Sequence, residues 1–103
     1  YRDFLKAIAA YIRQRSDVAF YADYLNVTSR YLGQVTNRVC GLTPKALIEQ
    51  KLIEALEHEL QATDQTIQEI ANGYKFSSQA HFTKLFKRIT GDTPSNYRKN
   101  HIK

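Results

Sequence analysis

The residues whose type and spacing could do chemistry lie in two helical segments, at about residues 28–40 and 77–90. An α-helix fits the major groove of DNA, where Arg can pair with guanine and Gln with adenine through two hydrogen bonds. Each segment carries polar residues opposite an apolar stripe. In the first segment the outward residues near the start are Ser29, Arg30, Gly33, Gln34 and Asn37. In the second they are Ser78, Gln79, Ala80, His81, Thr83 and Lys84. Both segments therefore offer groups that could contact base edges.

Each of these residues could instead have a purely structural role or simply face solvent. A polar residue on a helix can be ordinary solvated surface, and this reading competes with base contact for each polar residue named. Gly33 either lets the backbone approach DNA closely or is a helix defect that costs up to about 1 kcal/mol. An alanine such as Ala80 could meet a thymine methyl group.

Other kinds of chemistry find no support in the residue pattern. The three histidines, His58, His81 and His101, lack metal-ligand spacing, and Cys40 has no second cysteine with which to hold zinc. We expect Cys40 to be a small core residue. There is no Gly-rich phosphate loop. We therefore predict that the chain is not an enzyme and needs no metal or cofactor.

The charge distribution says more than the net charge of +5. Residues 28–48 contain three basic residues and no acid, and residues 75–103 contain seven basic residues against Asp92 alone. The intervening residues 49–69 contain six acids against Lys51. A protein that binds a polyanion keeps acids off its contact face. This segregation favours double-stranded DNA as the partner.

Part of the chain is written twice, which points to two equivalent DNA-reading units. The recurring positions in the first copy are Ala22, Val27, Leu32, Gly41, Thr43 and Pro44. Their counterparts are Ala71, Phe76, Phe82, Gly91, Thr93 and Pro94, 49 residues later for the first two and 50 for the others.

Helical periodicity runs through the chain, and no segment alternates like a strand. We predict helices at residues 3–15 and 18–24, the second capped by Asp17, and a left-handed turn residue at Asn26. Thr28 should cap a third helix that extends to about Cys40, and Gly41 should end it. Its predicted inward residues are Leu32, Val35 and Val39.

The second half repeats this order. Pro44 should begin a long helix to about Leu60, and Thr66 should form a capping box with Glu69. Ser77 should cap the next helix, which Gly91 ends, and Pro94 should open a short last one. The predicted buried residues of the long helix are Ile48, Leu52, Ala55, Leu56 and Leu60. Those of the helix after Ser77 are Phe82, Leu85, Phe86 and Ile89.

These residues resemble the DNA-binding domain of the AraC/XylS family of bacterial transcription regulators. The second copy carries the family's spacing best, through Ile70-Ala71, Phe76, Phe82, Phe86-Lys87, Gly91, Thr93-Pro94 and Tyr97-Arg98. The resemblance covers almost the whole chain. It implies an all-α fold of about seven helices, with two helix-turn-helix subdomains and a linking helix that sets their separation. Residues 1–103 then form a single DNA-binding domain. Its parts are a first helix-turn-helix unit (1–43), the linking helix (44–62) and a second helix-turn-helix unit (63–103).

The resemblance also implies site residues. It places Gln79, Ala80, His81 and Lys84 at base-reading positions. In the first copy the outward face of the helix predicts the same role for Arg30, Gly33, Gln34 and Asn37. The family usually has Gly where this chain has Lys75, and an apolar residue where it has Thr36. Lys75 either strains a left-handed turn or lies in a different turn near a phosphate. The expected phosphate contacts are Thr28, Arg38, Thr66, Lys75, Ser77, Lys87, Arg88 and Arg98.

The first interpretation is thus sequence-specific DNA binding by a cytoplasmic bacterial regulator that places two recognition helices in successive major grooves. The alternative is an all-helical protein-interaction module that docks a transcription partner through its acidic linking helix. RNA polymerase is a candidate partner under both. Because the chain starts at Tyr1, we expect it to be a fragment that lacks an effector or dimerisation domain. The sequence contains no run of about 18 apolar residues, so we expect no membrane contact within it.

Overall fold

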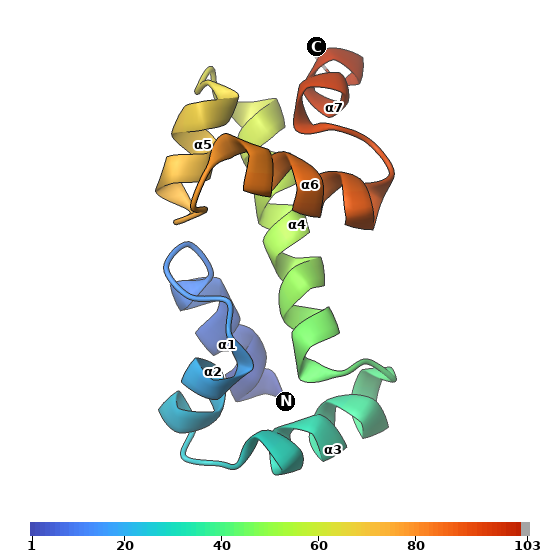
Figure 1. Ribbon diagram of the computed structural model, residues 1–103. Coiled ribbons are helices and arrows are strands. Elements are labelled where there is room, and N and C mark those ends of the chain that lie inside the picture. The colour runs from blue at the N-terminus through green and yellow to red at the C-terminus, as the bar shows by residue number, and fades with distance from the viewer. Residues whose placement is uncertain (102–103) are drawn as a thin grey trace. The chain divides into compact units, whose positions relative to one another are not determined.

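The computed structural model describes residues 1–101, and in that range it contains seven α-helices and no strand (Figure 1). The predicted all-α fold is confirmed. The helices are α1 (Arg2–Tyr11), α2 (Val18–Tyr24), α3 (Ser29–Cys40), α4 (Pro44–Ala62), α5 (Ile67–Gly73), α6 (Gln79–Thr90) and α7 (Pro94–Asn100). They gather into two compact units, residues 1–52 and residues from 53 onward, which divide α4 near its middle.

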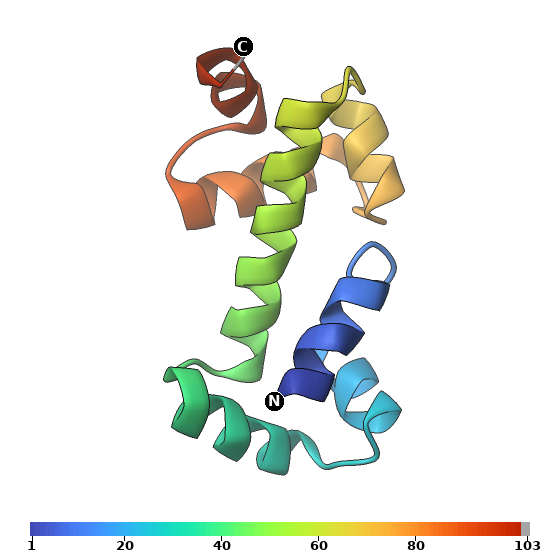
Figure 2. The ribbon, with the colours of Figure 1, turned by 180° about the vertical axis from the view of Figure 1, so that it is seen from behind.

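In the first unit α1 packs on α2, and α2 packs on α3 (Figures 1 and 2). Tyr21 lies at its centre with no exposed surface. Its ring meets that of Phe4 edge-on at 5.8 Å, and its hydroxyl donates to the Arg15 carbonyl at 2.8 Å. The other buried residues of this unit include Ala7, Ile8, Ile12, Ala22, Leu32, Thr36, Leu47, Ile48 and Leu52.

The first helix is shorter than predicted, because α1 ends at Tyr11 rather than at residue 15. The Arg15 carbonyl accepts the Tyr21 hydroxyl, and the Arg15 guanidinium forms a two-point pair with the Asp17 carboxylate at 2.9 and 3.0 Å. Asp17 in turn caps α2 by accepting the Phe20 backbone N–H, as predicted. Arg15 thus belongs to the start of α2.

In the second unit α5 packs on α6, and α6 packs on α7. The predicted capping box of α5 is confirmed. The Glu69 N–H donates to Thr66 Oγ1 at 3.0 Å, and the Thr66 N–H donates to Glu69 Oε1 at 2.8 Å. The buried residues of this unit include Ile53, Leu56, Leu60, Ile70, Ala71, Phe82, Phe86 and Pro94.

The long helix α4 buries more residues than its predicted face. Leu47 and Ile53 are buried in addition to Ile48, Leu52, Leu56 and Leu60, whereas Ala55 is only half-buried. The reason is that α4 contributes to two cores. Its first half supplies Leu47, Ile48 and Leu52 to one unit, and its second half supplies Ile53, Leu56 and Leu60 to the other.

The two copies share their turn chemistry. The left-handed residue of the first turn is Asn26, with φ 58°, and that of the second is Lys75, with φ 64°. The N–H that follows each of them returns to the preceding helix in the same way. The Val27 N–H donates to the Ala22 carbonyl at 3.0 Å, and the Phe76 N–H donates to the Ala71 carbonyl at 3.0 Å. Gly41 and Gly91 end α3 and α6 in the left-handed conformation, as predicted.

The other wrong predictions about burial concern mainly the last turns of α3 and α6. Val39 is 54% exposed, Ile89 is 37% exposed, and Cys40 is exposed rather than part of the core. Thr36 is fully buried instead, and its hydroxyl donates to the Gly33 carbonyl at 3.3 Å. Leu32 and Thr36 therefore anchor α3, and its last turn projects beyond the core.

Candidate nucleic-acid interface

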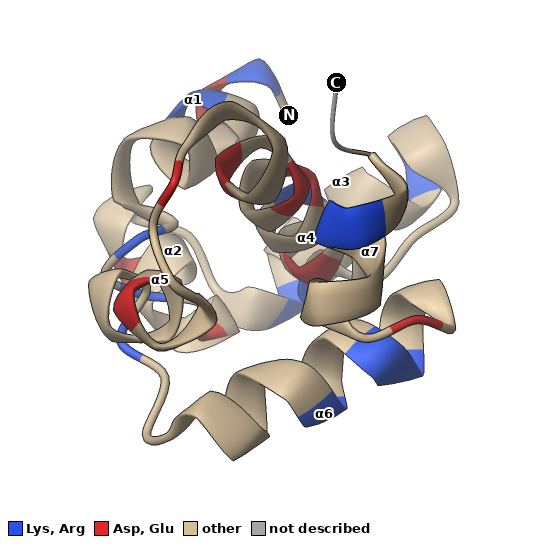
Figure 3. Ribbon diagram, turned by 90° about the horizontal axis from the view of Figure 1, so that it is seen from above, with Lys and Arg blue, Asp and Glu red and all other residues tan. Residues whose placement is uncertain are grey.

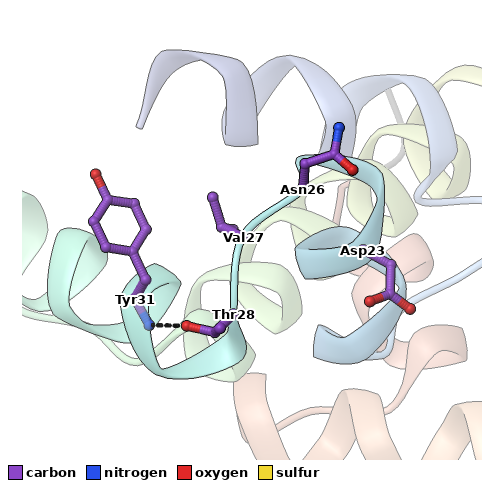
Figure 4. A pocket seen from close by; sticks show the side chains of 5 residues that line it. All are labelled: Asp23, Asn26, Val27, Thr28 and Tyr31. Atoms are coloured by element: carbon purple, nitrogen blue, oxygen red, sulfur yellow. Dashed lines mark hydrogen bonds between the residues drawn. The ribbon is translucent and has the colours of Figure 1, made fainter.

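Helix α3 presents a polar face directly opposite its buried anchors. Arg30, Gln34, Asn37 and Arg38 are all exposed. Their spacing of i, i+4, i+7 and i+8 places them on one face of a helix. The start of α3 is held by Thr28, whose Oγ1 accepts the Tyr31 N–H at 3.0 Å (Figure 4). The structure thus brings the polar residues predicted for the first copy together on one side, except for Gly33.

Gly33 does not share this open face. It is half-buried, and a methyl group at its Cα would lie 3.8 Å from Cδ of Pro44, an ordinary contact distance. The open side of its Cα faces the start of α4. This placement counts against a close approach of the Gly33 backbone to DNA.

Helix α6 presents the equivalent face in the second unit. Phe82 and Phe86 are fully buried, whereas Gln79, Ala80, His81, Lys84, Lys87 and Arg88 are exposed. Ala80, Lys84, Lys87 and Arg88 repeat the spacing seen on α3, 50 residues later. Neither α3 nor α6 contains an Asp or Glu. Figure 3 shows the Lys and Arg positions of α6 in blue along the helix.

The start of α6 corrects one prediction. The cap is Ser78, whose Oγ accepts the His81 N–H at 3.1 Å, and not Ser77. The Ser77 hydroxyl lies 3.2 Å from Nδ1 of His81 instead. The 50-residue offset that relates Leu32 to Phe82 also relates Thr28 to Ser78. This offset was the sequence signal for the residue that the prediction missed.

Phosphate contacts were also predicted at the helix starts near Thr66 and Thr28, where other groups of the protein lie close by. The Thr66 N–H already donates to the Glu69 carboxylate, and this bond is the main reason that the pKa of Glu69 is lowered. A shallow hollow beside Thr28 is lined by Asp23, Asn26, Val27 and Tyr31 (Figure 4). The negative charges of Glu69 near Thr66 and of Asp23 in this hollow disfavour a phosphate at either helix start.

Arg98 has a structural role that its basic character did not reveal. Its guanidinium donates to three carbonyls at and beyond the end of α4: Leu60 at 3.0 Å, Thr63 at 3.3 Å and Gln65. The last carbonyls of a helix lack intrahelical partners, and a cation is favourable beside them. Because all three nitrogens are used, Arg98 ties α7 to the end of α4 rather than presenting its charge outward.

The other basic residues remain at the surface. Arg38 lies in the last turn of α3, and Lys87 and Arg88 lie in the last turn of α6. A cation in a last helical turn also complements the helix dipole, so these residues have a modest structural role as well. Lys75 is exposed in its left-handed turn.

The described part of the chain offers neither a metal site nor a membrane-spanning helix. No group of three or more His, Cys, Asp or Glu residues there could hold a metal ion. No helix among residues 1–101 is long and apolar enough to cross a membrane.

Known proteins resemble this chain in sequence. It is 40% identical over 86 residues to the transposon Tn10 TetD protein of Escherichia coli, and this match covers 84% of the present chain and 60% of TetD. It is 34% identical over 82 residues to the HTH-type transcriptional activator AarP of Providencia stuartii, and this match covers 80% of the present chain and 58% of AarP. The chain thus spans about three fifths of the length of these relatives.

Solved structures resemble it in fold. The C-terminal domain of AraT, a response regulator from Geobacillus stearothermophilus, matches with a TM-score of 0.87 and 27% identity over 99% of this chain and 85% of that one. The DNA-binding domain of AdpA, solved in complex with a target DNA, matches with a TM-score of 0.84 and 18% identity over 96% and 89%.

A family model described as a helix-turn-helix domain matches residues 21–100, which is most of the chain and includes both turns. The chain therefore belongs to the helix-turn-helix domain family of AraC/XylS type.

Proposed function

We propose that this chain binds double-stranded DNA in a sequence-specific manner as part of a bacterial transcription regulator that works in the cytoplasm. One observation carries the proposal. Helices α3 and α6 occupy equivalent places in the two copies, each anchored by two buried residues, and each presents an exposed face with no acid. Such faces suit the major groove of a polyanion. The names of AarP, an activator, and of AdpA, a DNA-bound domain, agree with this function.

The exposed faces divide into two kinds of contact. We assign base reading to residues near the helix starts and phosphate contact to cations near the helix ends and in the second turn. The base-reading set is Arg30, Gln34, Asn37, Gln79, Ala80, His81 and Lys84. The phosphate set is Lys75, Arg38, Lys87 and Arg88. Five predicted residues are left out of these sets: Gly33, Thr28, Thr66, Ser77 and Arg98. Gly33 faces Pro44, the Thr66 N–H already donates to Glu69, and the Ser77 hydroxyl lies against His81. Arg98 binds carbonyls at and beyond the end of α4, and Asp23 lines the same hollow as Thr28.

The test begins with selection of bound duplexes from a random-sequence DNA pool. Fluorescence anisotropy with the selected duplex should then give an affinity that falls steeply with salt. Four phosphate contacts predict a slope of log K against log salt of about −3.6. A scrambled duplex should bind at least about a thousandfold more weakly at physiological salt. Failure to enrich any sequence would refute the function.

A spacing experiment tests whether both helices read DNA. Two helices of one chain that enter the same face of a duplex do so at successive major-groove openings, about 10 base pairs apart. Their outward residues differ, so we expect an asymmetric site with two unlike segments. Inserting about 5 base pairs between the segments should abolish specific binding, because one segment then faces away. Unchanged binding would mean that a single helix reads DNA, and we expect the idle one to be α3.

The protein-interaction alternative is not favoured, because the chain belongs to a DNA-binding family. Contact with RNA polymerase through the acidic linking helix α4 is compatible with DNA binding and forms part of the proposal. The match to the raffinose operon transcriptional regulatory protein RafR of Pediococcus pentosaceus covers 77 residues, which are only 28% of that protein. We therefore also propose that an effector or dimerisation domain accompanies this one.

A further inference from the structure

The second copy of the repeat contains one residue that the first copy lacks. Up to the turn, the copies are offset by 49 residues, as in Val27 and Phe76. From the helix caps onward the offset is 50, as in Thr28 and Ser78. The inserted residue therefore lies between Phe76 and Ser78, and it is Ser77. Its hydroxyl has no counterpart in the first unit.

Ser77 is placed against one of the exposed residues of α6. Its Oγ lies 3.2 Å from Nδ1 of His81. The His81 ring also meets the Phe76 ring edge-on, with the centroids 5.3 Å apart and the planes at 87°. The imidazole is thus restrained by an apolar ring and by a polar partner. In the first unit the equivalent residue is Tyr31, which is 54% exposed and lines the shallow hollow (Figure 4).

The hydrogen bond decides which ring nitrogen is available to DNA. With Nδ1 engaged by Ser77, Nε2 is the nitrogen left for a base edge. Nε2 carries the proton, and is a donor, when Ser77 donates to Nδ1 of the neutral ring. When Nδ1–H donates to Ser77 Oγ instead, Nε2 is an acceptor. The proposed contact uses the first tautomer. Guanine presents two adjacent acceptors, N7 and O6, to such a donor in the major groove, whereas adenine pairs its N7 with the N6 donor and thymine offers O4 alone.

We propose that Ser77 is a positioning residue that holds His81 so that its Nε2 reads a guanine. The inference rests on the proposed DNA-binding function and deepens it, because it names one specificity-determining pair and the base it selects. Ser77 itself need not touch the base. It acts by limiting the ring to one orientation, which lowers the conformational cost of forming a directed contact.

The experiment uses the duplex selected from a random-sequence pool by the unmodified chain, together with its single-base variants. Affinities are measured by anisotropy for the unmodified chain, Ser77→Ala, His81→Ala and the double variant. His81→Ala should abolish a guanine preference at one position. Ser77→Ala should reduce that preference about fivefold, which corresponds to one neutral hydrogen bond. The double variant should be no worse than His81→Ala, because both changes remove one interaction.

Two controls separate positioning from general damage. Ser77→Thr keeps the hydroxyl and should retain the preference, and Ser95→Ala makes the same chemical change on α7 and should leave every base preference unchanged. Thermal melts followed by circular dichroism confirm that each variant is folded.

Three results would overturn the inference while leaving the proposed function intact. They are an equal loss at all positions in Ser77→Ala, independent effects of the two substitutions, or a base other than guanine at the position that responds to His81→Ala. Failure of the pool to enrich any sequence would overturn the proposed function and this inference together.

Discussion

Replacing Lys75 with glycine should stabilise the protein. Lys75 has a φ of 64°, in the left-handed region that a side chain with a Cβ occupies at a cost of about 1–2 kcal/mol. Its N–H still donates to the Asn72 carbonyl at 3.2 Å, so the turn is an ordered part of the second unit. Glycine adopts this conformation without steric cost. Glycine should therefore keep the turn and its hydrogen bond while removing the strain.

The expected gain is smaller than the strain, because glycine gains more freedom in the unfolded chain. That entropy offsets about 0.5–1 kcal/mol. The net stabilisation should be about 0.5–1 kcal/mol, or about 2–8 °C in melting temperature for a domain of this size. DNA affinity should fall modestly at every sequence, because the substitution also removes a cation next to the recognition helix.

The matched control is Asn26→Gly, at the equivalent turn of the first unit. Asn26 has nearly the same φ, 58°, but Asn tolerates the left-handed region through local hydrogen bonding. Its replacement should change the melting temperature little or lower it. Because the chain has no Trp, far-UV circular dichroism of the helices is the suitable readout. A lower melting temperature for Lys75→Gly would refute the argument from strain, and unchanged DNA affinity would remove the phosphate role.

Three further outcomes are expected. Arg98→Ala should destabilise the protein by about 2 kcal/mol in urea titrations, because it leaves three carbonyls without their charged donor; a stable variant with weakened DNA binding would contradict this. Lys87→Ala should lose only about 0.3–1 kcal/mol of stability, from its interaction with the helix dipole, and should reduce the salt slope by about 1. Arg30→Ala should instead relax preference at particular bases. If both shifted every sequence equally, the division into base and phosphate contacts would fail. Burial raises the pKa of Tyr21 to about 12, above its ordinary 10.0, so its contribution is complete below about pH 10 and is lost as pH rises through about 12. Tyr21→Phe should therefore lose less stability over that pH range than the unmodified chain, and equal losses would show that Tyr21 is not responsible.

The amino-acid sequence was sufficient to predict features that depend on near neighbours. Asp17, Thr28 and the Thr66–Glu69 pair cap their helices through groups three residues apart, and Asn26 occupies a left-handed turn. Gly41 and Gly91 likewise end α3 and α6 through a left-handed backbone conformation that glycine favours. Each of these features is decided by backbone groups within one helical turn, so residue type and spacing are enough.

Periodicity also predicted which helix faces turn inward, but not where each face stops being covered. Val39 and Ile89 continue an apolar stripe and are nevertheless exposed, whereas the polar Thr36 is fully buried. Side-chain type gives a preference for burial, and coverage by other helices decides whether it is met. The polar faces of α3 and α6 could be predicted because they lie opposite those anchors.

Only the tertiary structure decided the surroundings of Gly33 and Arg98. Gly33 faces Pro44, and Arg98 binds carbonyls 33 to 38 residues earlier in the chain. From sequence alone, a glycine in a recognition helix and an arginine near the end of the chain both looked like DNA contacts. Their actual partners are set by how the helices pack, because packing brings together groups whose separation along the chain carries no periodic signal. Local hydrogen bonding thus determined the helices and caps from the sequence, and packing determined which of their polar groups remain available to a partner.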